Sequence, residues 1–310
     1  MSTSMDQFPS SNPVAPVFRP GEFKGREGLV RNVLRRLERG ESLSIVGGPK
    51  LGKTSLLLHL AWQLNHDHVV NTHKTPGPSA VYFDMADDAD CQRFRSRPQK
   101  PHTILLLDNC DSLVEGKTFS FSEIDPFRRG PTVFAGARAW REVVREGRLA
   151  HKLKSVPLAV FLEKEAQQII SPDLSSEQQA CVITYAGTHP YSIKVLQSAL
   201  LRAGPHVRLE QIVKDVKNPL SSFFQCCANQ LRGPLEHQVL TYLIEADKPV
   251  NPREVARAFG LPTIKPVADT LCSLGMVGRW IRDEEATLSA NSRLFKEWYR
   301  ETMASSDMID

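Results

Sequence analysis

Four residues of the chain, Gly47, Gly52, Lys53 and Thr54, have the spacing of a phosphate-binding loop, G-x-x-x-x-G-K-[ST]. The glycines let the backbone curl so that its N–H groups surround a phosphate, and the following helix adds the positive end of its dipole. In such a loop Lys53 reaches the β- and γ-phosphates and the Thr54 hydroxyl binds Mg²⁺. The sequence therefore predicts a site for ATP or ADP with Mg²⁺. We expect this site to include Gly47, Gly48, Pro49, Lys50, Leu51, Gly52, Lys53, Thr54 and Ser55.

The segments on either side of this loop favour the same interpretation. Leu43–Val46 is an apolar run typical of a strand, and Thr54–Leu64 is a helix-like run that contains neither glycine nor proline. A chance glycine-rich turn is the alternative, but it does not require a strand before it and a helix after it.

A second group of polar residues follows the apolar run Thr103–Asp108. A buried strand that ends in aspartate downstream of a phosphate loop is typical of a Walker B segment, so Asp108 is expected to hold Mg²⁺ beside Thr54. The alternative is a carboxylate that belongs to an ordinary turn at the end of a strand.

Five apolar segments must position these groups, and helix-like segments alternate with them. The alternation predicts an α/β fold with a five-stranded parallel sheet, in which ligands bind at the carboxyl ends of the strands. The expected strands are Leu43–Val46, Ala80–Met85, Thr103–Asp108, Pro131–Ala137 and Ser155–Leu162.

The order of motifs resembles that of AAA+-related STAND ATPases and of the origin-recognition branch of AAA+ proteins. Phe-x-Gly-Arg-Glu at Phe23–Glu27, then the amphipathic run Leu29–Leu37, then the phosphate loop form the first part of this resemblance. It implies that Gly25 and Arg26 close over the adenine. An ordinary turn with surface charge is the alternative for these two residues.

The resemblance also assigns two residues further along the chain. Arg138, which follows the fourth expected strand, is implied to sense the γ-phosphate, and the alternative is a surface arginine. The segment Ala186–Tyr191 is similar to the part of the STAND lid in which a proline, here Pro190, contacts the adenine. Pro190 is also explained by the preference of proline for the first position of a helix.

The chain departs from the family's pattern immediately after Asp108. Relatives commonly carry a carboxylate there as the base for the attacking water, whereas this chain has Asn109, which cannot accept a proton. Asp111 is the nearest carboxylate in the sequence that is expected to substitute. We therefore predict a slow ATPase whose catalytic residues are Lys53, Asp108, Asn109, Asp111 and Arg138.

The C-terminal part is expected to form a winged helix, with helices over Pro234–Glu245, Pro252–Phe259 and Thr263–Leu274 before a hairpin. The complete prediction is a P-loop NTPase fold of AAA+/STAND type, followed by a helical lid and this winged-helix domain. The expected domains are a disordered arm (1–20), a nucleotide-binding domain (21–172), a helical lid (173–230), a winged helix (231–300) and a tail (301–310).

Composition and charge limit the class of protein. The 310 residues are 41% hydrophobic, no apolar run reaches the roughly 18 residues of a membrane helix, and the N-terminus lacks the features of a secretory signal. The six cysteines form no C-x-x-C pair, which is typical of a protein of the reducing cytosol. We therefore expect a cytoplasmic protein with buried thiols and no membrane partner.

Two functions from different classes remain open. The resemblance implies a signalling switch, as in bacterial signalling or conflict defence, that forms homo-oligomers or engages a separately encoded effector or sensor protein according to its nucleotide. The alternative is a DNA-binding AAA+ ATPase of the origin-recognition or transposition type. DNA binding is disfavoured because residues 231–310 carry 10 Lys and Arg against 12 Asp and Glu, a net charge of −2.

Overall fold

The computed structural model divides the chain into two compact units. The sheet unit comprises Pro16–Gly48 and Gly52–Leu158, and the helical unit comprises Pro49–Leu51 and Ala159–Asp310. The structure describes residues 15–17, 19, 21–70, 79–96, 103–114, 130–137, 153–203, 207–231, 233–246, 248–282 and 285–306. Arg138 and most of the expected arm lie outside these residues.

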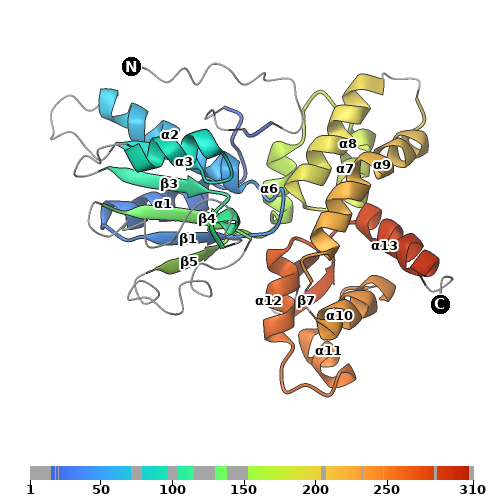
Figure 1. Ribbon diagram of the computed structural model, residues 1–310. Coiled ribbons are helices and arrows are strands. Elements are labelled where there is room, and N and C mark those ends of the chain that lie inside the picture. The colour runs from blue at the N-terminus through green and yellow to red at the C-terminus, as the bar shows by residue number, and fades with distance from the viewer. Residues whose placement is uncertain are drawn as a thin grey trace. The chain divides into compact units, whose positions relative to one another are not determined.

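The sheet unit contains five parallel strands in the order β2-β3-β4-β1-β5 (Figure 1). This arrangement confirms the predicted α/β fold. The strands are β1 (Leu43–Val46), β2 (Ala80–Asp84), β3 (Ile104–Asp108), β4 (Thr132–Gly136) and β5 (Lys154–Pro157). The helices are α1 (Glu27–Glu38), α2 (Lys53–Val70), α3 (Asp88–Ser96) and α4 (Asp111–Val114).

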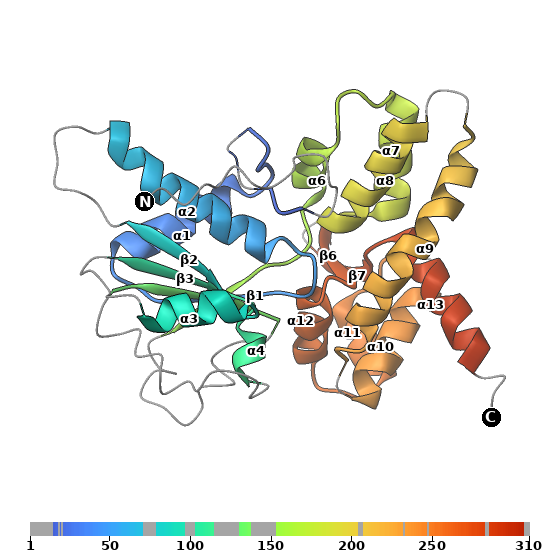
Figure 2. The same ribbon diagram turned by 45° about the horizontal axis from the view of Figure 1, so that its top comes forward.

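The middle of this sheet is fully buried. Every residue of β3 and β4 is buried, as expected for parallel strands that are covered on both faces. Figure 2 shows α1 and α2 on one face of the sheet and α3 and α4 on the other. Because the strands are parallel, the carboxyl ends of β1, β3 and β4, and the loops that follow them, lie along one edge of the sheet.

The helical unit is built from helices and one small antiparallel hairpin. Three helices followed by the hairpin β6–β7 form the arrangement expected of a winged helix, and Val250 adds a bridge to Leu288 of β7. The elements are α6 (Glu163–Ile169), α7 (Ser176–Ala186), α8 (Pro190–Ala203), α9 (Leu209–Ala228), α10 (Pro234–Glu245), α11 (Pro252–Ala258), α12 (Lys265–Ser273), β6 (Val277–Arg282), β7 (Glu285–Ala290) and α13 (Arg293–Ser306).

One continuous apolar core runs through the helical unit, from Phe161 to Tyr299. The boundary expected at residue 231 falls inside this unit, between α9 and α10. A polar contact between distant segments accompanies the core, because the Thr188 hydroxyl donates to Asn291 Oδ1 at 2.8 Å. Gly187 lies so close to Asn291 that an added Cβ would approach its carbonyl oxygen to 1.8 Å.

Two simpler expectations can also be compared with the structure. All six cysteines are free, and four of them are buried as expected, whereas Cys226 of α9 is exposed and Cys272 of α12 is half-buried. Among the described residues, none of the helices combines the length and the apolar character that a membrane span requires.

Candidate nucleotide site

The predicted phosphate loop connects β1 to α2 in the sheet unit. Its first residue is fixed to the neighbouring strand, since the backbone N–H of Gly47 donates to the carbonyl oxygen of Gly136 at 3.1 Å. The loop turns through two left-handed residues, Gly52 with φ +94° and Lys50 with φ +57°. Lys50 is not a glycine, so this conformation costs roughly 1–2 kcal/mol.

Positive charge is concentrated at the end of this loop. The Lys53 ammonium donates to the carbonyl oxygens of Gly47 and Gly48, both at 2.8 Å, and is therefore folded over the loop. Lys53 is also the first residue of α2, whose first turn contains no acidic residue. The helix N-terminus and the ammonium together favour an anion at this position. The hydroxyl of Ser55, also expected in the site, accepts from the backbone N–H of Val17 at 3.1 Å.

Asp108 ends β3 and is fully buried. Its Oδ1 accepts from the N–H of Asn109 at 2.9 Å, and its Oδ2 accepts from the Tyr82 hydroxyl at 3.0 Å. Burial raises the pKa of the Asp108 carboxyl, and a hydrogen bond with Thr54 and the charge of Lys53 oppose that shift. Burial and the Asp108 charge raise the pKa of Tyr82, so its hydroxyl stays a donor.

This donor set fits a magnesium ion that arrives with phosphates. Mg²⁺ is usually held by one or two carboxylates together with substrate phosphates and water. Asp108 and Thr54 supply one carboxylate and one hydroxyl in hydrogen-bond contact. The residues described by the structure contain no group of three or more His, Cys, Asp or Glu that would hold a metal without a nucleotide.

Asn109 and Asp111, the two residues expected to act on water, have different surroundings. Asn109 has the left-handed φ of 51°, and its Nδ2 donates to Asp84 Oδ1 at 2.9 Å. Asp111 Oδ2 accepts from the backbone N–H of Ala137 at 2.6 Å. Asp111 therefore caps the end of β4, a structural task that competes with the predicted role as a base.

The segment expected to contact the adenine is tied to α2. The ring of Phe23 stacks on the ring of His59, with centroids 4.3 Å apart. Gly25 has φ +82°, its N–H donates to Glu27 Oε1 at 3.1 Å, and Arg26 is the buried N-cap of α1. Gly25 and Arg26 thus belong to an ordered turn held against the helix that follows the phosphate loop.

The other predicted site residues lie outside the sheet unit or outside the described residues. Arg138 lies outside the described residues. Pro190 is the first residue of α8 and belongs to the helical unit, as do Pro49, Lys50 and Leu51. Within the sheet unit the structure brings together the loop glycines, Lys53, Thr54, Asp108 and Asn109.

Sequence reasoning did not identify two residues of β2, Tyr82 and Asp84, which contact Asp108 and Asn109. The register pairs Asp84 with Asp108, so both strands end at the same level. The available signal was an aspartate at the end of the expected strand Ala80–Met85. That aspartate indicates a site residue only once β2 is known to lie next to β3.

The structure resembles solved P-loop ATPases over almost its whole length. It is similar to the Walker-type ATPase PABY2304 of Pyrococcus abyssi, with a TM-score of 0.56, 14% identity, and coverage of 92% of this chain and 98% of that chain. It is also similar to the Aeropyrum pernix ORC2 protein, solved in ADPNP–ADP complexes, with a TM-score of 0.53, 13% identity, and coverage of 94% and 98%.

These likenesses show that the chain has the fold of AAA+-type P-loop ATPases. No protein-family model matches the sequence, and the search of curated proteins also found no match.

Proposed function

We propose that this protein binds ATP with Mg²⁺, hydrolyses it slowly, and acts as a STAND-like switch whose nucleotide state controls assembly. The observation that carries the proposal is the pairing of the phosphate loop with a buried carboxylate. Lys53 and the start of α2 favour phosphate, while Asp108 and Thr54 lie in hydrogen-bond contact beside them.

The chain's own residues divide the work of hydrolysis. Lys53 and the loop N–H groups bind the phosphates, and Thr54 and Asp108 would hold Mg²⁺, which supplies charge neutralisation at the transferred phosphate. Asn109 can orient a water molecule but cannot take its proton. Because general-base assistance is worth about 10²–10⁴ in rate, we expect turnover that is slow compared with typical ATPases.

The second candidate function is the DNA-binding ATPase of origin-recognition type that the order of motifs also allows, and the likeness in fold to the Aeropyrum pernix ORC2 protein extends over the C-terminal helices as well as the sheet. The charges of the winged-helix segment oppose it. On α12, Asp269 forms an ion pair with Arg279 of β6 at 2.7 Å, so a cation of the hairpin is already neutralised. Duplex binding requires cations that are available to phosphates.

The mass of the full-length protein in solution tests this proposal. We expect a larger assembly, or a complex with a protein partner, when a non-hydrolysable ATP analogue is bound than when ADP is bound. In the Lys53→Ala variant the mass should be the same with either nucleotide. The same mass with both nucleotides and with candidate partners would contradict the switch. Salt-sensitive assembly only on duplex DNA would favour the second function instead.

A further inference from the structure

Asp84 and Asn109 form a side-chain pair at the carboxyl ends of two neighbouring strands. Asp84 ends β2 and lies in register with Asp108 of β3, and Asn109 follows directly. The Nδ2 of Asn109 donates to Oδ1 of Asp84 at 2.9 Å, while the backbone of Asn109 takes a left-handed conformation. The pair therefore lies next to the Mg²⁺-binding carboxylate proposed above.

The pair determines which way the Asn109 amide faces. An ionised carboxylate only accepts hydrogen bonds, so the NH₂ side of the amide must face Asp84. The reversed amide would place two oxygen atoms against each other. Asn109 Oδ1, the atom that can accept a hydrogen bond from water, is consequently directed away from Asp84.

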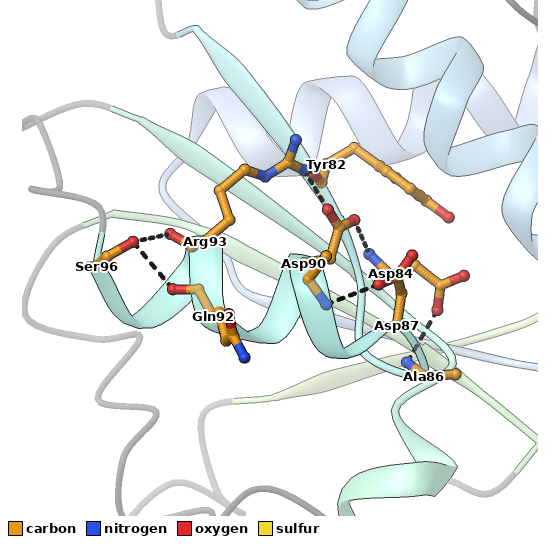
Figure 3. A network of polar contacts seen from close by, with 9 residues as sticks. Tyr82, Asp84, Ala86, Asp87, Asp90, Gln92, Arg93 and Ser96 are labelled. Atoms are coloured by element: carbon orange, nitrogen blue, oxygen red, sulfur yellow. Dashed lines mark hydrogen bonds and ion pairs between the residues drawn. The ribbon is translucent and has the colours of Figure 1, made fainter.

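Asp84 is itself held by the start of α3, as Figure 3 shows. Its backbone N–H donates to Asp90 Oδ2 at 2.8 Å, and its Oδ1 also accepts from the N–H of Ala86 at 2.9 Å. Asp90 in turn pairs with Arg93 at 2.9 Å, and Arg93 donates to the carbonyl oxygen of Tyr82 at 2.9 Å. The bond from Ala86 holds the Asp84 carboxylate, and the bonds through Asp90 and Arg93 hold the backbone of β2 to α3.

The other carboxylates near Asn109 have different partners. Asp108 accepts from the Tyr82 hydroxyl and from the Asn109 backbone, and Asp111 accepts from the backbone of Ala137. Among the described hydrogen bonds, only the one to Asp84 involves the Asn109 side chain. Control over the Asn109 amide can therefore be assigned to Asp84.

We propose that Asp84 is a positioning residue, which orients Asn109 so that Oδ1 presents an acceptor to the attacking water. The inference rests on the proposed ATP hydrolysis and adds a residue from β2 to it. It also has a consequence for engineering. A carboxylate placed at position 109 would face Asp84 across the distance of a hydrogen bond with no donor between them, so the two oxygen atoms would repel each other.

The test is a four-corner cycle of steady-state ATPase kinetics on the full-length protein: wild type, Asp84→Asn, Asn109→Asp and the double variant that exchanges the two residues. Asp84→Ala is added to remove the acceptor. Asp87→Asn is the matched control, because Asp87 lies three residues further on and its side chain accepts from Ala89 instead.

We expect Asp84→Ala to lower kcat about 10-fold with KM little changed, because misplaced reacting groups cost rate rather than binding. Asp84→Asn keeps an acceptor oxygen, so its kcat should fall less than that of Asp84→Ala. The kcat of Asp87→Asn should equal that of wild type. Asn109→Asp alone should be no faster than wild type, because its carboxylate loses the hydrogen bond to Asp84 and is repelled from the position that Asn109 occupies. The exchanged variant should be about 10-fold or more faster than wild type, because the amide introduced at position 84 then donates to an ionised base at position 109.

Three results would overturn the inference. The first is an equal kcat in Asp84→Ala and wild type. The second is an effect of Asp84→Ala on KM alone, and the third is an Asn109→Asp rate equal to that of the exchanged variant. The proposed function fails separately, if wild type shows no turnover above Lys53→Ala, and the positioning role then falls with it.

Discussion

The hydroxyl of Tyr82 donates to Oδ2 of Asp108 at 3.0 Å, so the carboxylate proposed for Mg²⁺ is oriented by the neighbouring strand. Tyr82 lies on β2, two residues before Asp84, and its phenol stays protonated because burial and the Asp108 charge raise its pKa. β2 therefore supplies a partner to each of the two consecutive residues that end β3 and begin the next turn.

Tyr82→Phe tests this support. Removal of the hydroxyl leaves Asp108 less firmly oriented, and the loss of such an outer partner typically costs 10–100-fold in metal affinity. We expect ATP hydrolysis to require about 10-fold more Mg²⁺ for half its maximal rate. Tyr242→Phe, in α10 of the helical unit, is the control. An unchanged Mg²⁺ requirement in Tyr82→Phe would remove the role of this hydrogen bond.

Asp108→Asn tests whether the buried charge of Asp108 lowers the stability of the folded protein. The folded pKa of Asp108 is raised above its ordinary value of 3.8, so the charge costs stability at neutral pH and costs none where the group is protonated in both states. We expect the variant to have a higher melting temperature than wild type at pH 8. This difference in melting temperature should shrink as the pH falls towards 3.8. Mg²⁺-dependent hydrolysis should be lost. A variant that melts below wild type at pH 8 contradicts this view of the site.

Gly187→Ala tests the close contact between Gly187 and Asn291 within the helical unit. Gly187 has φ +63°, and an added Cβ would overlap the Asn291 carbonyl. Strain and displacement should together cost at least about 2 kcal/mol. Gly28→Ala is the matched control, since Gly28 lies in α1 with open space around it and alanine there should stabilise by up to about 1 kcal/mol. Thermal unfolding measures both, and equal melting temperatures would contradict the packing at Gly187.

Arg138→Ala tests a prediction that comes from the sequence alone. If Arg138 senses the γ-phosphate, the variant should bind ADP with nearly wild-type affinity and lose most of the preference between ATP and ADP. Arg253→Ala, an exposed residue of α11, is the control. Titrations with both nucleotides decide the matter, and an unchanged preference would assign sensing to another residue.

The parts of the site that depend on local sequence were predictable. Gly47 and Lys53 lie in one motif, and the apolar run before Asp108 indicates a buried strand without further information. Relationships between strands were not predictable, because the order β2-β3-β4-β1-β5 is not written in any one segment. The contacts of Asp84 with Asn109 and of Asp111 with Ala137 both depend on that order.

The helical unit illustrates the same limit on a larger scale. Its helices were recognisable from their periodicity, and so was the hairpin. The contact between Thr188 and Asn291 joins residues 103 positions apart, and no local pattern indicates such a pairing. One continuous apolar core joins the segments predicted as lid and winged helix, and no local pattern indicates which of their side chains meet in it.

Calorimetric titration of the full-length protein with ATP and Mg²⁺ tests the central claim most directly. Wild type and Lys164→Ala, an exposed lysine of α6, should bind one ATP per chain. Lys53→Ala should lose at least about 10-fold in affinity while the protein stays folded, because its ammonium binds phosphate and is not part of the apolar core. Equal affinity in Lys53→Ala and wild type, or no binding to wild type, would contradict a nucleotide site at this loop.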